Sequence, residues 1–310
     1  MNIDIIGAGA IGLLLAGGLG AAGHNVYLWT RTEEQARQIN GQGLVLESQG
    51  ELRRVTGPGI RAAALSSGFS ERAGAAEWVL LAVKQRHLTS ALLESLAPLK
   101  ESRVPVLCLQ NGMGHLDLLS RYLNQDQLYA AITTEGAKKL SANHVIRSMP
   151  GETRLGIPFE AERGRLEAFA VLLDQAGFSA LMAKDIEREM FRKLLINAAI
   201  NPLTAIWRIP NGELLASEER KAVLNKLIDE ALEVLKRSGI PYDADIREQI
   251  MGICRATSGN ISSMLADVQR GEETEVDFIN GYLAQLASKA GMEAPTHELV
   301  WRLIRGLSNP

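Results

Sequence analysis

Short apolar runs in the first half of the chain have the length and the β-branched content of buried strands. Residues 2–6 form one such run, which stops at a glycine, and an apolar stretch with helical character follows over residues 11–19. Residues 25–29 form a second strand-like run. A strand, a helix and a strand within roughly 30 residues make a βαβ unit, which predicts a parallel sheet covered by helices. Further strands are predicted at residues 78–83, 105–109 and 128–133.

The hydrophobic period changes in the second half, where apolar residues recur at helical spacing. Helices are predicted over residues 190–200, 218–238, 246–255 and 276–290. We therefore expect an α/β fold with an N-terminal Rossmann-type, doubly wound parallel sheet in residues 1–185. A mostly α-helical C-terminal domain is expected in residues 186–310. The boundary rests on the change of period, which places it near residues 183–188.

Composition and charge indicate the class of ligand. The chain has 310 residues, of which 46% are hydrophobic and 22% charged, and its formal net charge is −3. Neither half carries a basic block, so the chain lacks the electrostatic attraction that a nucleic acid or an anionic membrane would require. We expect a small-molecule ligand, with no nucleic-acid partner and no membrane partner.

The two cysteines, Cys108 and Cys254, lie far apart and lack the spacing of metal ligands, which argues against a disulfide framework and a structural zinc site. No basic region precedes the apolar first residues, and no run reaches the roughly 20 apolar residues of a membrane span. These features favour a cytoplasmic protein without a metal.

A glycine-rich turn lies between the first predicted strand and the first predicted helix. Its sequence matches the dinucleotide-binding pattern G-x-G-x-x-G and comprises Gly7, Ala8, Gly9, Ala10, Ile11 and Gly12. In this pattern Gly7 makes a tight turn, Gly9 lets the backbone approach a pyrophosphate, and Gly12 allows helix and strand to pack closely. The start of the helix adds amide donors and partial positive charge. We predict that these residues bind a dinucleotide; the alternative is a purely structural turn.

The end of the second predicted strand distinguishes NAD from NADP(H). NAD-binding proteins place a carboxylate there to hold the ribose 2′-hydroxyl, whereas this chain has Arg31 between Thr30 and Thr32. Because an arginine can bind a 2′-phosphate, NADP(H) is the predicted cofactor. Glu33 and Glu34 leave an alternative open, since a shifted turn would let one of them contact the ribose.

Two polar residues follow later strands of the predicted sheet. Lys84 follows residues 80–83, and Asn111 follows the strand that ends at Leu109. Ligands of open parallel sheets bind beyond the carboxyl ends of the strands, so we expect both residues near cofactor and substrate. A solvated loop lysine and an ordinary Asn-Gly turn are the alternatives.

Three polar residues spaced four apart, Lys193, Asn197 and Asn201, interrupt an apolar helical segment. Steps of four residues advance only about 40° around a helix, so the three side chains form one stripe. Buried polar groups need partners, which predicts that the stripe lines a polar cavity. A lysine there can act as a general acid in ketone reduction, because desolvation lowers its pKa. In the alternative, Lys193 extends to solvent and both asparagines bond to nearby backbone.

A second polar set lies downstream, at residues 258–263 and 274–277. Thr274 and Asp277 resemble a capping pair, which would place Glu275 in the first turn of the following helix and keep its carboxylate ionised. Taken alone, Glu275 is a charge near a helix dipole, and Ser263 is a helix cap or a surface hydroxyl.

At these residues the chain strongly resembles the ketopantoate reductases, the 2-dehydropantoate 2-reductase family of pantothenate synthesis. The matching stretches span nearly the whole chain in the family's order, at residues 7–12, 109–112, 193–205, 210–214, 260–264 and 274–281. The resemblance implies a Rossmann domain followed by a helical domain. It also implies NADPH-dependent reduction of ketopantoate to pantoate, with hydride passing to the C2 carbonyl and a proton coming from Lys193.

The resemblance further implies roles for the matching residues. Lys193 is similar to the family's general acid, and Glu275 to the carboxylate that holds the substrate hydroxyl and orients the lysine. Asn111 would contact the reacting oxygen and the nicotinamide. The remaining substrate-side residues would be Asn197, Asn201, Asn211, Asn260 and Ser263, the last receiving the substrate carboxylate. The cofactor would be contacted by Arg31, Lys84, Asn111 and Glu275 as well as by the glycine turn.

Three positions depart from the family pattern. Glu135 stands where a histidine or small residue is common, and Arg208 and His297 stand where asparagine is often found. They leave room for a related reductase of another 2-oxo or β-keto acid. A nucleotide-sensing protein without turnover is the alternative from another class. The sequence is compatible with a monomer or a homodimer.

Overall fold

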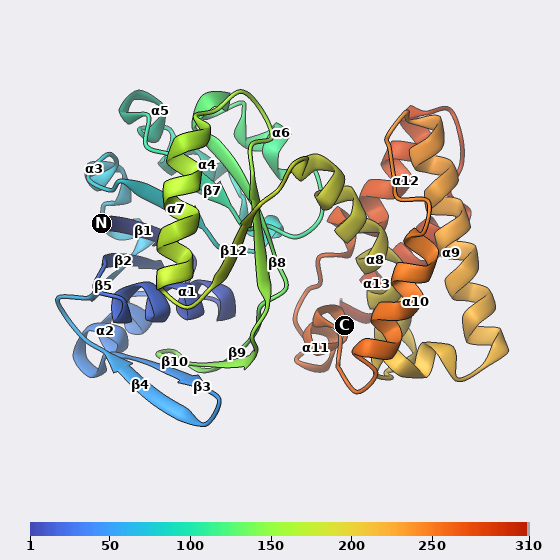
Figure 1. Cartoon of the computed structure of the whole chain (residues 1–310), viewed down its shortest axis with the longest axis horizontal. Helices are drawn as coiled ribbons and strands as arrows, with labels where there is room; N and C mark the ends of the chain where they lie inside the picture. Colours follow the sequence, from blue (N-terminus) through green and yellow to red (C-terminus); the bar gives the residue numbers. More distant parts are fainter. Residues whose placement is uncertain (309–310) are drawn as a thin grey trace. The chain divides into compact units, whose positions relative to one another are not determined.

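The computed structural model of the protein describes residues 1–308 and divides into two compact units (Figure 1). Unit 1 comprises residues 1–110 and 115–186, and unit 2 comprises residues 111–114 together with the chain from residue 187 onward. The predicted domains had a single boundary, whereas the short segment 111–114 packs with the second unit. The carboxyl end of a unit 1 strand therefore leads directly into unit 2.

Unit 1 contains an eight-stranded sheet with the strand order β12-β11-β8-β7-β6-β1-β2-β5. Neighbouring strands from β8 to β5 are parallel, while β11 runs antiparallel to β8. The chain builds outward from β1 in both directions, which confirms the predicted doubly wound α/β fold. The strands are β1 (Asn2–Ile6), β2 (Asn25–Thr30), β5 (Ile60–Ala64), β6 (Trp78–Leu81), β7 (Val106–Cys108), β8 (Leu128–Thr133), β11 (Glu152–Gly156) and β12 (Ser179–Met182).

Helices cover both faces of this sheet because its strands are apolar on both sides. Within β1, Ile3 and Ile5 belong to one core cluster and Ile6 to the other. The first cluster packs against α1, α2 and α7, and the second against α3, α4, α5 and α6. The helices are α1 (Ala10–Ala21), α2 (Glu33–Gln42), α3 (Phe69–Arg72), α4 (Ser90–Leu96), α5 (Leu99–Ser102), α6 (His115–Leu119) and α7 (Arg163–Gln175).

A second, four-stranded sheet in unit 1 was not predicted. Its order is β4-β3-β10-β9, and its strands are β3 (Leu44–Ser48), β4 (Glu51–Val55), β9 (Gly136–Ser141) and β10 (His144–Met149). Helix α1 packs closely on it, since a Cβ at Gly17 would lie 2.7 Å from Leu44. β4 and β9 are largely exposed, with charged residues at successive positions. They therefore lack the apolar run by which a buried strand is predicted.

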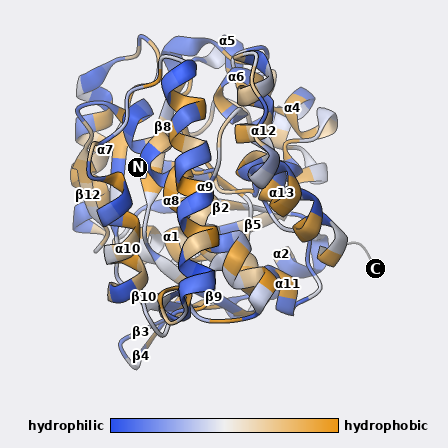
Figure 2. Cartoon of the chain, turned by 90° about the vertical axis from the view of Figure 1, so that its right-hand side faces the viewer, coloured by the Kyte–Doolittle hydropathy of each residue, from blue (hydrophilic) through white to orange (hydrophobic). Residues whose placement is uncertain are grey.

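Unit 2 is helical, as predicted, and its principal helices are α8 (Ile186–Trp207), α9 (Glu218–Arg237), α10 (Ile246–Ala256), α11 (Ser263–Gln269), α12 (Asn280–Lys289) and α13 (Pro295–Ser308). In α9, the Ser217 hydroxyl caps the first turn by accepting from the Arg220 amide, and one apolar face is buried. Figure 2 shows the hydrophilic and hydrophobic residues that alternate along this helix. Within residues 1–308, no helix combines the length and the apolar character that crossing a membrane requires.

The prediction of a helix over residues 276–290 was wrong about where the helix begins. Residues Val276–Phe278 form a short 3-10 turn, η5, and α12 begins only at Asn280. Thr274 and Asp277 do not form a capping pair: Asp277 accepts from the Trp301 indole at 2.5 Å. The buried Asn280 amide donates to the Ala198 carbonyl at 3.0 Å. These tertiary bonds to α8 and α13 set the start of α12.

Candidate functional site

The glycine turn between β1 and α1 has a different requirement at each glycine. Gly7 has φ +111°, and a Cβ there would lie 2.9 Å from the backbone after β6. A Cβ at Gly12 would lie 1.8 Å from the Gly7 carbonyl oxygen. A Cβ at Gly9 would meet no atom within 4 Å. The packing of the fold therefore explains the glycines at both ends of the turn, whereas at Gly9 the backbone faces open space and packing alone does not require glycine.

Arg31 follows β2 directly and is exposed. The next residue, Thr32, caps α2 by accepting from the Gln35 amide, so the helix begins at Glu33. Glu34 is paired with Arg37 at 2.5 Å and lies in the first turn of this helix. This arrangement leaves the position after the strand to an arginine, which suits a 2′-phosphate rather than a ribose hydroxyl.

Lys84, which was also predicted to contact the cofactor, follows β6 and is half-buried before a short 3-10 turn. The neighbouring Gln110 side chain donates to the Leu81 carbonyl at 2.7 Å and to the Val83 carbonyl at 3.1 Å, which ties the ends of β6 and β7 together. Because β1, β2 and β6 are parallel neighbours, Gly7, Arg31 and Lys84 follow their carboxyl ends at the same edge of the sheet.

Unit 2 contains a pocket of about 220 Å³ that is lined by Asn111, Asn197, Ser263, Met264, Asp267, Glu275 and Ile279. Four of these were predicted site residues, namely Asn111, Asn197, Ser263 and Glu275. The Asn111 amide donates to the Glu275 carboxylate at 3.3 Å.

Asn111 owes its position to the backbone that follows it. Gly112 has φ +78°, and a Cβ there would lie 2.4 Å from the Phe278 carbonyl oxygen. The Met113 amide donates to that same carbonyl at 3.1 Å. Only glycine permits this close approach, which explains why the segment packs against the turn that follows Glu275.

Lys193 lies on α8 one turn before Asn197 and is half-buried. Burial lowers the pKa of its ammonium from the ordinary 10.5 to about 8, and the negative charge of Glu275 opposes part of that shift. Lysine and carboxylate thus interact electrostatically within unit 2. An ammonium with a pKa near neutral pH is suited to proton transfer.

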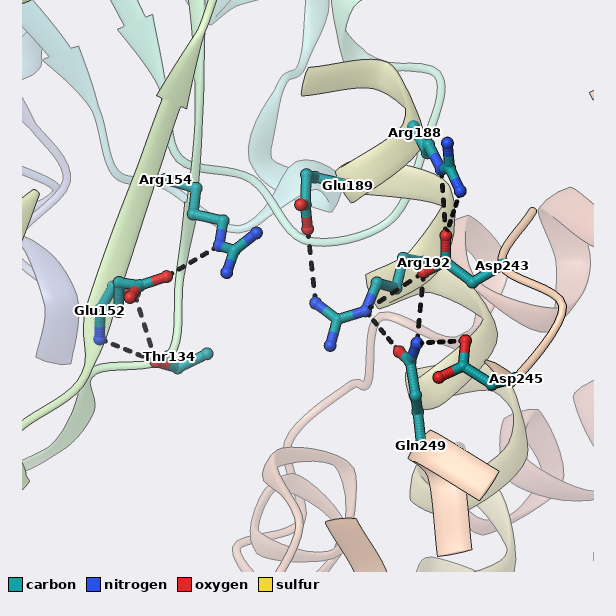
Figure 3. Close-up of polar contacts among 9 residues, drawn as sticks. All are labelled: Thr134, Glu152, Arg154, Arg188, Glu189, Arg192, Asp243, Asp245 and Gln249. Carbon is teal, nitrogen blue, oxygen red and sulfur yellow. Dashed lines mark hydrogen bonds and ion pairs between the residues drawn. The ribbon is translucent and has the colours of Figure 1, made fainter. Parts of the chain in front are cut away.

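Ion pairs hold the first turns of α8 in place (Figure 3). Arg188 and Arg192 both pair with Asp243, which lies before α10. The Arg192 guanidinium also donates to the Gln249 side chain at 2.6 Å, and the Gln249 amide donates to Asp245 at 2.9 Å. This network precedes Lys193 directly in the helix and links the first turns of α8 to the start of α10.

The two asparagines of the stripe differ in burial. Asn197 lines the pocket, while Asn201, one turn later, is buried. Within residues 1–308, neither side chain forms a hydrogen bond to the protein, although the structural alternative required bonds to nearby backbone. Both amides therefore retain the capacity to bind a ligand.

The remaining predicted substrate residues, Asn211 and Asn260, do not line this pocket. The Asn211 side-chain amide donates to the Thr257 hydroxyl at 2.9 Å, and its backbone amide donates to the Asn260 carbonyl at 3.0 Å. These bonds join the 3-10 turn after α8 to the loop after α10. Asn260 is exposed beyond this junction.

Three pocket residues were not predicted from the sequence, namely Met264, Asp267 and Ile279. Asp267 is buried and pairs with Arg270 at 2.6 Å. The available signal was its spacing of four from Ser263, which places both residues on one face of a helix. That helix, α11, was not predicted, because its seven residues are too few to show a clear period.

Two of the three departures from the family pattern have structural partners. Glu135 is buried and forms an ion pair with Arg147. His297 is buried, and its ring nitrogens lie 3.0 Å from the Asn280 amide nitrogen and 3.0 Å from the Leu227 carbonyl oxygen. Arg208 is exposed after α8 with φ +54°, a left-handed conformation that asparagine adopts more readily.

A family model for the ketopantoate reductase PanE/ApbA matches residues 3–158, and a second model, for the C-terminal part of this family, matches residues 185–308. The chain belongs to the ketopantoate reductase family. A 2-dehydropantoate 2-reductase of Archaeoglobus fulgidus is 31% identical over 309 residues, which cover 99% of this chain and 98% of the relative. The family is one of oxidoreductases.

Solved structures agree with this assignment. A PanE/ApbA family ketopantoate reductase from Ralstonia eutropha has a TM-score of 0.86 at 27% identity, with 100% of this chain and 99% of that chain covered. D-mandelate dehydrogenase, solved with NADH and anilino(oxo)acetate, has a TM-score of 0.91 at 23% identity. The match covers 100% of this chain and 98% of the dehydrogenase chain. The second likeness shows the shared fold alone.

Proposed function

We propose that the protein reduces ketopantoate to pantoate with NADPH. The observation that carries the proposal is the interaction of Lys193 with the Glu275 carboxylate, in a unit that also holds the amide-lined pocket. Burial lowers the pKa of this lysine to about 8. Membership of the ketopantoate reductase family supplies the substrate. A proton donor is required for ketone reduction and has no use in a protein that only senses a nucleotide.

In this proposal the cofactor is held by the glycine turn, Arg31 and Lys84. The open backbone at Gly9 receives the pyrophosphate, Arg31 binds the 2′-phosphate, and Lys84 adds positive charge at the same edge of the sheet. NADPH supplies a hydride to the carbonyl carbon of the substrate. The preference for NADPH over NADH rests on Arg31 standing where NAD-binding proteins carry a carboxylate.

The residues of unit 2 bind the substrate and supply the proton. The Ser263 hydroxyl receives the substrate carboxylate, and the amides of Asn111 and Asn197 bind its oxygens. As hydride reaches C2, the carbonyl oxygen gains negative charge and takes a proton from the Lys193 ammonium. The neutral amine is then reprotonated from water. Glu275 orients the lysine and accepts from the substrate hydroxyl.

The test is a panel of 2-oxo and β-keto acids, each assayed with NADPH and with NADH at the absorbance of the reduced nicotinamide. Ketopantoate with NADPH should give the highest kcat/KM. Faster turnover of another acid would reassign the substrate. NADPH binding without consumption of any acid would identify a nucleotide-sensing protein.

Substitution tests the mechanism in the same assay. Lys193→Ala should lower turnover about 100-fold or more, the usual contribution of a general acid, while the protein stays folded. Lys221→Ala is the matched control, because that lysine forms an ion pair with Glu218 on the surface of α9. A Lys193→Ala enzyme with the turnover of the control would refute the assigned proton donor.

A further inference from the structure

The glycine turn is contacted by a cation that the family motifs do not include. The carbonyl oxygen of Ala8, which lies between Gly7 and Gly9, accepts from the Lys139 ammonium at 3.2 Å. It also accepts from the Gln35 side-chain amide at 3.0 Å. Ala8 itself is buried. Two side chains distant in sequence therefore converge on the backbone of the turn.

Lys139 reaches the turn from β9, in the small second sheet of unit 1. Its neighbour Lys138 points to the opposite face of that strand, because successive side chains of a strand alternate. Gln35 makes a second bond, donating to the Ala142 carbonyl just after β9 at 2.8 Å. The hairpin of β9 and β10 is therefore tied to the turn by Gln35 independently of the lysine.

The Ala8 carbonyl does not require a lysine as its hydrogen-bond donor. The Ala8 carbonyl already has an amide donor, and the Gln35 bonds already link hairpin and turn. Holding a lysine side chain in one conformation carries an entropic penalty of its own. What the ammonium adds is positive charge next to Gly9, where the backbone faces open space.

We propose that Lys139 is a further cofactor-binding residue, whose ammonium is oriented by the Ala8 carbonyl to bind the pyrophosphate of a nicotinamide dinucleotide. The inference rests on the dinucleotide binding in the proposed function and is independent of the substrate. Charge-assisted hydrogen bonds to phosphate are among the stronger polar contacts in proteins. Lys139 thus complements the helix N-terminus of α1 at the same phosphates.

This assignment has a signature that separates Lys139 from Arg31. The pyrophosphate is common to NADPH and NADH, whereas only NADPH carries the 2′-phosphate. Loss of the Lys139 charge should therefore weaken both dinucleotides by the same factor. Loss of Arg31 should weaken NADPH selectively.

The experiment measures the Kd of NADPH and of NADH by nicotinamide fluorescence, without substrate. Lys139→Met, which keeps most of the side-chain length, should raise both Kd values about tenfold or more. Lys139→Arg should restore them to within about threefold. The Kd of the Lys139→Met variant should also depend less steeply on salt, because a cation that faces phosphate has been removed.

Two variants separate charge from structure. Lys138→Met removes the adjacent charge on the other face of β9 and should leave both Kd values unchanged. Gln35→Ala breaks the link between hairpin and turn without a change of charge. An equal loss of affinity in Gln35→Ala and Lys139→Met, with the salt dependence of wild type, would overturn the proposal. So would an effect of Lys139→Met on NADPH alone, or none on either dinucleotide. If the wild-type protein binds neither NADPH nor NADH, the cofactor assignment itself is refuted.

Discussion

The proton donation proposed for Lys193 predicts that the reduction depends on pH in a way that follows from burial. The donor must be protonated, and its pKa is lowered from 10.5 to about 8. At pH 9 about one-tenth of the lysine would then carry a proton, compared with about 97% for an unperturbed lysine. The kcat/KM for the 2-oxo acid at saturating NADPH should therefore be level below about pH 7 and fall about tenfold per unit above pH 8.

The carboxylate of Glu275 gives a second, directional prediction from the same interaction. Its negative charge raises the pKa of Lys193 against the effect of burial. Glu275→Gln removes that charge, so the fall in kcat/KM should move to lower pH. Substrate binding also weakens in this variant, and the position of the fall, rather than the height of the plateau, is the quantity to compare.

Loss of activity above pH 8 must be distinguished from unfolding. The pKa of Lys193 is lower in the folded chain than in the unfolded chain, so the unfolded chain binds more protons between about pH 8 and pH 10.5. This lysine therefore makes the folded state more stable as pH rises through that window. Thermal unfolding recorded along the same pH series provides the control. A level profile to about pH 10, or a fall that Glu275→Gln leaves in place, would contradict the assigned donor.

Two further predictions concern the cofactor side. Gly9→Ala should fold with near wild-type thermal stability, since its Cβ enters open space, yet it should bind NADPH at least about tenfold more weakly. Gly12→Ala should destabilise the protein, because its Cβ would lie 1.8 Å from the Gly7 carbonyl oxygen. Equal melting temperatures for the two variants would contradict this interpretation of the turn. Arg31→Ala should raise the KM for NADPH about 10- to 100-fold and leave that for NADH nearly unchanged, and a parallel rise for both cofactors would remove Arg31 from the 2′-phosphate.

Much of the fold is encoded in local patterns. The strands 2–6 and 128–133 coincide with β1 and β8, and the segment 218–238 ends one residue beyond α9. These elements were predictable because buried strands and amphipathic helices have a characteristic apolar period. The exposed strands β4 and β9 and the seven-residue helix α11 lack such a period, so they were missed.

The candidate site divides in the same way. The glycine spacing of residues 7–12 and the fourfold spacing of Lys193, Asn197 and Asn201 each lie within one local element, where neighbours in sequence set the geometry. The contact between Asn111 and Glu275 joins residues 164 positions apart. It depends on Gly112 packing against the Phe278 carbonyl. No local period encodes such a contact.

Residue types and spacing thus specified a dinucleotide turn, a polar stripe and the family to which the chain belongs. Packing set the pKa of Lys193, added Asp267 to the pocket and brought Lys139 to the Ala8 carbonyl. The reason is physical. Backbone geometry relates residues within one helix or strand, whereas desolvation, charge interactions and contacts between elements depend on how those elements pack in three dimensions.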